Sequence, residues 1–258
     1  MCYLGIDIGS LSCDAVLLDD DENILAFAVV PTGARNQEAI GRARREVLEQ
    51  AGREEAGIRA TVSTGYGRER VQGRQDSVTE ITCHARGIQK FFPQTKVLID
   101  IGGQDSKAIA VSSGKVIDFA MNDKCAAGTG RFLEAMSRAL EVDIDDLGAL
   151  DMHAKGLQTI SSMCTVFAES EVVGLVARGS EVAEIANGIN RAIAARTFSL
   201  ARRIYPGLRG APVAMSGGVA RNSGVVRALS ILLERPIDVP AEPDIVGALG
   251  AALIARRR

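Results

Sequence analysis

The chain has 258 residues, of which 47% are hydrophobic, and its formal net charge at pH 7 is -2. A chain of this length and composition can bury a large core, in one large domain or in two smaller ones. The small net charge gives no electrostatic reason to expect nucleic acid or an anionic membrane as a partner, and two His argue against a histidine-built metal site.

The first strand pattern, Leu4 to Ser10, is an apolar run closed by Asp, Gly and Ser. A second strand-like run, Ala15 to Leu18, follows, and a turn at Asp20 to Asn23 leads into a third, Ile24 to Val30. Short apolar runs separated by turn residues are typical of a β-meander. The chain therefore begins with a three-stranded antiparallel unit, and its first turn is rich in small residues.

The next segment alternates helices and short strands. Residues Asn36 to Ala51 place five apolar side chains on one helical face, and Gly52 ends that helix. We expect strands at Arg59 to Thr64 and Gln75 to Val78, and a helix over Ile81 to Phe92 that Pro93 stops.

The tetrapeptide Ile6-Asp7-Ile8-Gly9 recurs as Ile99-Asp100-Ile101-Gly102. It is again followed by a strand, Lys107 to Val111, a turn and another strand, Val116 to Ala120. Repetition with the same strand–turn–strand sequel indicates an internal duplication.

The second half repeats the order with longer helices. The predicted helices and strands are, in chain order, helices at Thr129 to Leu140, Asp143 to Leu150, Phe167 to Ala177 and Val182 to Ile204, a strand at Val213 to Ser216, a helix at Ser223 to Leu233, a strand at Ile237 to Val239 and a closing helix at Pro243 to Ala255.

Two Asp-x-Gly turns that face one another across a cleft would aim two carboxylates and two sets of backbone N–H groups at one point. This arrangement predicts a nucleoside triphosphate site in which Asp7 and Asp100 hold Mg²⁺ through its waters. Gln104 would orient the attacking water. In the alternative reading, each Asp merely caps its turn.

A third glycine turn, Gly217 to Asn222, follows a buried strand and is placed to bind the base and ribose. The residues that we expect to contact the nucleotide are Gly9, Ser10, Leu11, Ser12, Cys13, Asp14, Gly102, Gly103, Gln104, Asp105, Gly128, Thr129, Asp145, Gly217, Gly218, Val219, Asn222 and Asp244.

The stretch Asn122 to Glu134 sets Cys125 and a glycine-rich turn at the start of a helix. Glycines permit close backbone approach, and the first turn of a helix presents N–H groups to an anion. Phosphate or a thiolate-bound cluster would both fit, and so would a capped helix start with a buried Cys.

These residues carry a resemblance. The Asp-x-Gly repeat and the Gly217-Gly218-Val219 turn resemble the fold shared by acetate and sugar kinases, heat-shock ATPases and actin. Within that group, three stretches resemble the ATP-dependent activators of 2-hydroxyacyl-CoA dehydratases and the related ATP-binding subunits of benzoyl-CoA reductase. The three stretches are Gly102 to Lys107, Asn122 to Glu134 and Ser161 to Glu171.

The resemblance covers essentially the whole chain and implies a duplicated actin-like, ribonuclease H-like α/β fold. It implies a first subdomain over 1–96, with the helix at 245–258 packing back onto it. A second subdomain over 97–244 would carry the cluster ligands, and the two subdomains would flank a nucleotide cleft.

The resemblance also implies a homodimer that shares one four-iron four-sulfur cluster, with Cys125 and Cys164 as the two ligands from each subunit. Four thiolates around one cluster agree with the usual ligation of such clusters, and a twofold axis supplies them from two chains. Cys2, Cys13 and Cys83 are assigned to packing. A zinc or disulfide use of Cys125 and Cys164 remains an alternative.

The implied activity is an ATP-driven, oxygen-sensitive electron gate in an anaerobic cytoplasm. A reduced ferredoxin or flavodoxin would charge the cluster, and a dehydratase or reductase component would receive the electron. We place the coupling between nucleotide and cluster at Gly128-Thr129-Gly130. The start of the chain shows no signal-peptide pattern, the run Ile245 to Ala255 is too short to span a membrane, and five Cys then favour redox, metal or core roles.

One departure from the family concerns Asp14. Family members commonly carry Lys at this point of the first turn, so Asp7 and Asp14 would place two carboxylates near the phosphates. Nucleotide binding would be weaker unless Mg²⁺ or Lys107 compensates, or unless Asp14 points away along its strand.

Two rival functions remain open. A small-molecule kinase of the same fold would need an acceptor pocket and a catalytic base. An actin-like or chaperone-like assembly protein would use nucleotide as a switch and would hold no iron. Colour after anaerobic reconstitution separates both rivals from the electron gate.

Overall fold

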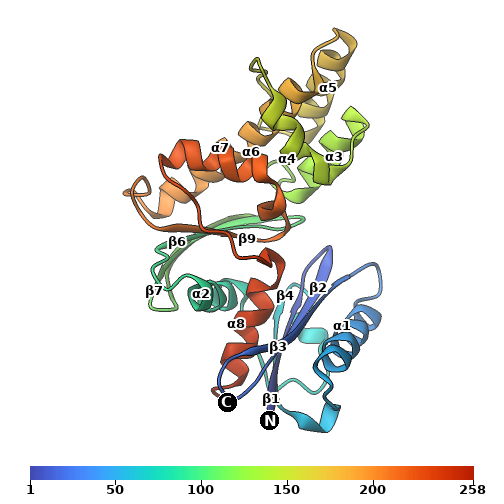
Figure 1. Ribbon diagram of the computed structural model, residues 1–258, viewed down its shortest axis with the longest axis vertical. Helices are drawn as coiled ribbons and strands as arrows, with labels where there is room; N and C mark the ends of the chain where they lie inside the picture. Colours follow the sequence, from blue (N-terminus) through green and yellow to red (C-terminus); the bar gives the residue numbers. More distant parts are fainter. The chain divides into compact units, whose positions relative to one another are not determined.

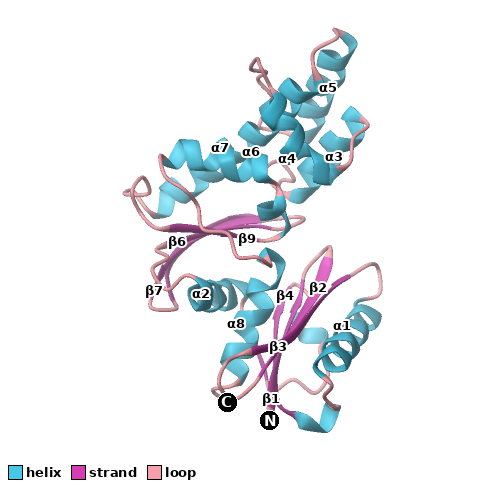
Figure 2. Ribbon diagram, viewed as in Figure 1, coloured by secondary structure: helices cyan, strands magenta, loops and turns pink.

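The computed structural model describes residues 1–258 (Figures 1 and 2). The chain divides into two compact units. Unit 1 contains Met1–Thr95, Val111–Ile117 and Pro240–Arg258, and unit 2 contains Lys96–Ala110 and Asp118–Val239. The chain thus leaves unit 1 and returns to it.

Unit 1 is built on a five-stranded sheet in the order β3-β2-β1-β4-β5. Strands β1 (Cys2–Ile8), β2 (Ser12–Leu18) and β3 (Ile24–Pro31) form the expected antiparallel meander. Strands β4 (Ile58–Gly65) and β5 (Asp76–Ser77) continue the sheet in parallel pairing.

Helices cover both faces of this sheet, as Figure 1 shows. Helix α1 (Asn36–Ala51) packs on β2 and β3 through the five apolar residues that the sequence placed on one face. Helices α2 (Glu80–Phe91) and α8 (Val246–Ala255) lie together, and α8 packs on β1, β2 and β4. The contact is close, since a Cβ on Gly5 would lie 2.0 Å from the carbonyl oxygen of Ala248.

The sheet of unit 2 has four strands in the order β8-β7-β6-β9, and only Val111–Ile117, around the turn from β7 to β8, are grouped with unit 1. Strand β6 (Val97–Ile101) pairs antiparallel with β7 (Ser106–Ser112) and parallel with β9 (Val213–Ser216), and β8 (Lys115–Asn122) is the edge strand. This order repeats β3-β2-β1-β4 of unit 1. The duplication predicted from the repeated tetrapeptide is therefore confirmed at the level of the sheets.

Five helices complete unit 2: α3 (Gly130–Leu140), α4 (Leu147–Leu150), α5 (Thr165–Ala177), α6 (Val182–Ile204) and α7 (Ser223–Leu233). One apolar core joins them to β6 and β9, and its largest fully buried side chains include Phe132 and Met136. The long helix α6 contacts α3, α4, α5 and α7, so it forms the centre of this unit.

Three sequence predictions differ from the structure. The strand expected at Ile237 to Val239 is a single bridge between Ala214 and Asp238, because Pro236 and Pro240 on either side lack the N–H that a ladder needs. The helices expected at Asp143 to Leu150 and Pro243 to Ala255 each begin with a 3₁₀ turn, at Ile144–Asp146 and Pro243–Ile245. None of the helices is both long enough and apolar enough to cross a membrane.

Candidate functional site

The first glycine turn joins β1 to β2 in unit 1. The N–H of Gly9 donates to the carbonyl of Ser12 at 2.9 Å, and Thr32 fastens the turn by donating its Oγ1 to the carbonyl of Gly9 at 3.0 Å. Ser10 and Ser12 are half-buried and Leu11 is exposed. The turn is thus held in one conformation by its own backbone and by β3.

Two acids lie side by side beneath this turn. Asp7 and Asp14 are register partners on β1 and β2, and they are only 7% and 6% exposed. Asp14 accepts a hydrogen bond from Ser12 Oγ at 3.1 Å through Oδ2, whereas its Oδ1 is buried without a hydrogen-bond partner. Burial, followed by the charges of Asp7 and Asp244, holds the pKa of Asp14 well above its usual value.

Glycines make room for the Asp7 carboxylate. A Cβ on Gly247, at the start of α8, would lie 1.9 Å from Asp7 Oδ2, and a Cβ on Gly65 would lie 2.4 Å from Oδ1. Gly65 also has a φ of +83°, which other residues rarely adopt. Asp7 is therefore enclosed by backbone on both sides.

The second glycine turn has the same backbone geometry in unit 2. The N–H of Gly102 donates to the carbonyl of Asp105 at 3.0 Å, which matches the Gly9–Ser12 bond of the first turn. Here, however, a buried ammonium joins the acids. Lys107 Nζ donates to Asp105 Oδ1 at 2.8 Å and to Asp100 Oδ2 at 3.3 Å, and Ser216 Oγ donates to Asp100 Oδ1 at 2.7 Å.

The start of helix α3 is bonded directly to this second turn. The N–H groups of Gly130 and Arg131 donate to the carbonyls of Gly102 and Gly103, each at 2.9 Å. A Cβ on Gly130 would lie 3.2 Å from both the Gly102 oxygen and the Gly103 Cα. Two amides that the sequence left available for an anion are therefore used inside the protein, and they connect the turn to the segment after Cys125.

The third turn, after β9, reaches the same acid. Gly217 has a φ of +82°, and a Cβ there would lie 3.0 Å from Asp100 Oδ1 and 2.4 Å from the Ile101 oxygen. Asn222 caps α7 by accepting from the N–H groups of Gly224 and Val225 at 2.9 and 3.1 Å. Asn222 also donates to Asn190 Oδ1 on α6 at 3.1 Å, which ties the turn to the central helix.

The sequence-predicted nucleotide residues thus fall into groups within each unit. In unit 1, Asp7, Asp14 and Asp244 lie close enough for their charges to interact, beside the turn from Gly9 to Ser12. Cys13 is instead buried in the apolar core. In unit 2, Asp100 contacts the second and third turns, while Val219 is buried and Asp145 is exposed on a 3₁₀ turn. Ser216 was missed, although it directly precedes Gly217. Lys107 was expected only to compensate for the charge of Asp14. The tetrapeptide repeat could have shown that Lys107 occupies, in the second half, the position that Asp14 has in the first.

The two candidate metal ligands lie on adjacent loops of unit 2. Cys125 and Cys164 are free thiols and partly exposed, and Cys125 Sγ lies 3.8 Å from the carbonyl oxygen of Met163. Cys164 is the N-cap residue of α5. No three His, Cys, Asp or Glu side chains gather into a metal site within the chain. A donor set of two soft thiols fits half of a four-thiolate cluster.

The other three cysteines are buried. Cys2, Cys13 and Cys83 are at most 1% exposed, and burial raises the pKa values of Cys13 and Cys83 to about 12. Neutral thiols in apolar surroundings are poor ligands and poor nucleophiles. The packing role predicted for them agrees with this burial.

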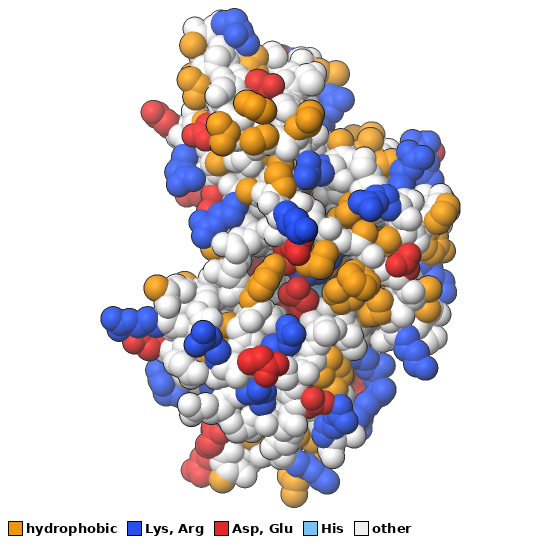
Figure 3. Space-filling view, turned by 180° about the vertical axis from the view of Figure 1, so that it is seen from behind, with side chains coloured by type: hydrophobic (Ala, Val, Ile, Leu, Met, Phe, Trp, Pro, Cys, Tyr) orange, Lys and Arg blue, Asp and Glu red, His pale blue; other side chains and the backbone are white.

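Exposed apolar side chains surround the Cys164 loop and α5. Met163, Val166, Phe167, Val173 and Val176 are between 44% and 79% exposed. Figure 3 shows hydrophobic side chains gathered at the end of unit 2 that α5 occupies. An apolar surface of this kind marks a protein interface in many soluble proteins.

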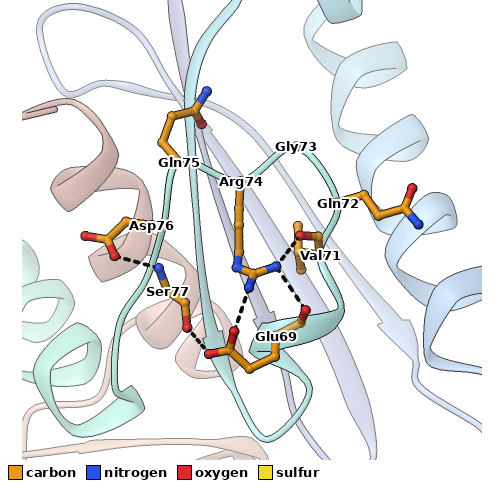
Figure 4. Close-up of a pocket in the computed structure, with 8 residues that line it drawn as sticks. All are labelled: Glu69, Val71, Gln72, Gly73, Arg74, Gln75, Asp76 and Ser77. Atoms are coloured by element: carbon orange, nitrogen blue, oxygen red, sulfur yellow. Dashed lines mark hydrogen bonds and ion pairs between the residues drawn. The ribbon is translucent and has the colours of Figure 1, made fainter.

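Other hollows lie away from the predicted residues. The loop from Glu69 to Ser77 lines an open hollow of about 570 Å³, where Arg74 donates to Glu69 Oε2 at 2.5 Å and to the Val71 carbonyl at 2.7 Å (Figure 4). A second cavity, of about 480 Å³, lies between α6, α7 and the segment 157–162. None of the predicted site residues lines either cavity.

Comparisons with known proteins identify relatives along the whole chain. Residues 4–255 match the model of the BadF/BadG/BcrA/BcrD ATPase family. The activator of lactoyl-CoA dehydratase from Anaerotignum propionicum is 45% identical over 99% of this chain and 97% of its own length.

Solved structures show the same similarity. The (R)-2-hydroxyglutaryl-CoA dehydratase component A of Acidaminococcus fermentans superposes with a TM-score of 0.95 at 41% identity, over 100% of this chain and 98% of that one. The activator of 2-hydroxyisocaproyl-CoA dehydratase from Clostridium difficile, with bound ADPNP, gives 0.93 at 41%, over 100% and 95%. A ROK-family glucokinase from Streptomyces griseus, over 100% of both chains with a TM-score of 0.61 and 15% identity, shares the fold alone.

Proposed function

The chain belongs to the BadF/BadG/BcrA/BcrD ATPase family, and we propose that it is an ATP-hydrolysing activator that delivers a low-potential electron to an acyl-CoA dehydratase or a benzoyl-CoA reductase-type partner. The observation that supports this most is the direct bonding between the second glycine turn and the helix that follows Cys125. This bonding would join a phosphate-binding turn to a cluster ligand within one unit.

We assign phosphate binding to the backbone N–H groups of the turns. In unit 1 these are the turn residues Ser10 to Ser12. In unit 2 they are Gly103 and Gln104 of the expected stretch Gly102 to Gln104, because the N–H of Gly102 already donates to the carbonyl of Asp105. Asp7 and Asp100 hold Mg²⁺ through its waters, as Mg²⁺ prefers, and Gln104 orients the water that attacks the γ-phosphate. The third turn and Asn222 bind the base and ribose.

Coupling follows from the bonds of Gly130 and Arg131. When ATP is hydrolysed, any movement of the Gly102–Gly103 carbonyls shifts the first turn of α3, and Cys125 lies only a few residues before that turn. ATP must bind the two arrangements unequally, because a ligand with equal affinity for both shifts nothing. We therefore assign the coupling to Gly128-Thr129-Gly130, and the bonds of Gly130 and Arg131 to the second turn support this assignment.

Cys125 and Cys164 would hold a four-iron four-sulfur cluster shared by two subunits. A bound cluster would supply one-electron redox chemistry between a donor such as ferredoxin or flavodoxin and the partner. The chain's own contribution is two thiols on fixed loops and an apolar surface around them. We assign that surface to contact with a second copy of the chain, because five of its exposed residues are large and apolar, although Glu169 and Glu171 are exposed beside them.

The test is anaerobic reconstitution followed by metal analysis. We expect about four iron atoms per dimer and a brown colour in the natural chain, and loss of both in Cys125→Ala and Cys164→Ala. Cys2→Ala, which changes a buried thiol, serves as the control. An ATP-dependent reduction assay with a purified dehydratase then tests delivery. A Cys125→Ala protein that keeps its iron, or a colourless natural chain, would contradict the proposal.

A further inference from the structure

Arg196 of α6 lies beneath both cysteine-bearing loops. We call residues 122–129 the Cys125 loop and residues 161–164 the Cys164 loop. Arg196 is half-buried, and its Nη1 donates to the carbonyl oxygen of Ser162 at 2.9 Å. Ser162 is two residues before Cys164. The guanidinium thus fixes the backbone of the Cys164 loop to the central helix.

The aliphatic stem of the same side chain supports the other loop. A Cβ built on Gly128 would lie 2.7 Å from Arg196 Cδ and 3.4 Å from Cγ, so the backbone of Gly128 rests directly on the stem. Gly128 has a φ of +85° and lies three residues after Cys125. One side chain therefore contacts both loops through different atoms.

The loops also meet each other at the thiol. Cys125 Sγ lies 3.8 Å from the Met163 carbonyl, and Asn122 Nδ2 donates to the carbonyls of Cys125 and Ala127 at 2.8 and 3.2 Å. The Cys125 loop is thus closed on itself by Asn122. The Cys125–Met163 contact and Arg196 join it to the Cys164 loop, in addition to the packing of α3 on α5.

We propose that Arg196 is a positioning residue that sets the separation of the two thiols within one chain. This inference rests on the proposed function, because it takes Cys125 and Cys164 as the ligands. An arginine suits the task, since its guanidinium is always charged and gives a strong hydrogen bond to a carbonyl while its stem packs against backbone. Arg196 touches neither substrate nor nucleotide in this assignment and acts through the loops.

Three variants separate the two contacts. Arg196→Ala removes both the stem and the guanidinium. Arg196→Met keeps most of the stem and removes the bond to Ser162, and Arg196→Lys keeps the stem and a cationic donor. Arg191→Ala, an exposed position on the same helix, is the control.

The first readout is amide hydrogen exchange in the metal-free chain. We expect exchange in both loops to become about tenfold faster in Arg196→Ala, because a charge-assisted bond and a packing contact are lost. In Arg196→Met the Cys164 loop alone should accelerate, and Arg196→Lys should restore most of the protection. Unchanged exchange in both loops, or faster exchange spread through α7 as well, would overturn the inference.

The second readout is the rate at which reconstituted protein releases iron to a chelator. Arg196→Ala should release iron about tenfold faster than the natural chain, with Arg196→Lys in between and Arg191→Ala unchanged. Retention of iron by Cys125→Ala would instead defeat the ligand assignment itself. If the ligand assignment is confirmed but Arg196→Ala releases iron at the same rate as the natural chain, only the positioning role of Arg196 is wrong.

Discussion

The turn between β1 and β2 in unit 1 and the turn between β6 and β7 in unit 2 have the same tetrapeptide and the same closing hydrogen bond, but different charges beside them. Asp7 lies opposite Asp14, whereas Asp100 lies opposite Lys107. Lys107 bonds two carboxylates of its own unit. Asp14 keeps one buried oxygen without a partner.

The difference shows that the same backbone turn can have different charged side chains beside it. In unit 2 the cation belongs to the chain, so one of the two carboxylate charges is offset before any ligand arrives. In unit 1, burial and the charge of Asp7 disfavour the ionised form of Asp14, so this carboxylate favours a proton or a nearby cation. The first turn should therefore respond to pH and to Mg²⁺ more strongly than the second.

The largest effect is expected from Lys107→Met, which removes the built-in cation of unit 2. Asp100 and Asp105 would remain buried without their ammonium, and breaking such a pair from one side destabilises by about 3 to 5 kcal/mol. Chemical denaturation at pH 7 measures the loss. Lys115→Met, at an exposed position, is the matched control. A loss below about 1 kcal/mol would show that the acids are neutralised in another way.

Asp14→Asn should remove the charge conflict in unit 1 and stabilise the metal-free chain at pH 7 by about 1 to 3 kcal/mol. Because the pKa of Asp14 is raised in the folded state, the folded chain binds the proton more tightly than the unfolded chain. Its contribution to stability is then fully present below the usual pKa of 3.8 and is lost as the pH rises toward the folded value.

The measurement for this variant is the free energy of unfolding from pH 4 upward for both proteins. The gap between them should widen with rising pH in favour of the Asn variant. A gap that does not depend on pH would mean that folding leaves the pKa of Asp14 unchanged, and would contradict the raised pKa. Asp21→Asn, in an exposed turn of the same unit, controls for the general loss of an acid.

Asp14→Lys copies the unit 2 arrangement into unit 1. We expect ATP to bind about tenfold more tightly, and its affinity to depend less on Mg²⁺, because an ammonium would replace a carboxylate beside the phosphates. Calorimetric titration with and without Mg²⁺ measures both effects. Asp21→Lys makes the same charge change away from the turn. Equal affinity in the natural and Asp14→Lys proteins would place Asp14 outside the nucleotide's reach.

The smallest effect is expected from Gly130→Ala, which tests the contact that unit 2 has and the first turn lacks. The new methyl group would crowd the Gly102 carbonyl, at 3.2 Å, and loosen the link between the turn and α3. ATP affinity should change less than twofold, while ATP-dependent electron delivery should fall about threefold to fivefold. Equal losses in both quantities would assign Gly130 to nucleotide binding instead of coupling.

Much of this could be predicted from the sequence, because local patterns determine it. The tetrapeptide repeat led to the duplicated sheets, and the bounds of α1, α6, α7 and β9 match the periodicity, cap and turn signals that predicted them. Asp14 was expected either to face the phosphates or to point away. It lies opposite Asp7 within the buried cluster.

The rest depends on contacts between residues far apart in the chain. From the sequence, Lys107 was a candidate to compensate for the charge of Asp14. In the structure Lys107 is buried and forms ion pairs with Asp100 and Asp105. Arg196, Gly128 and Ser162 share no local pattern, since the fold brings them together over tens of residues. The 3₁₀ turns at Ile144–Asp146 and Pro243–Ile245 differ from helix starts in geometry more than in composition.

Helix α8 covers one face of the sheet of unit 1, although it comes after unit 2 in the sequence. The face of β2 that carries Val16 and Leu18 has its partners in Ile245, Leu249 and Leu253. During synthesis on the ribosome, that face stays uncovered while all of residues 118–239 are being made. Unit 2 can fold before unit 1 is complete. A nascent chain that stalls before α8 would expose an apolar face of the β-sheet to chaperones and proteases.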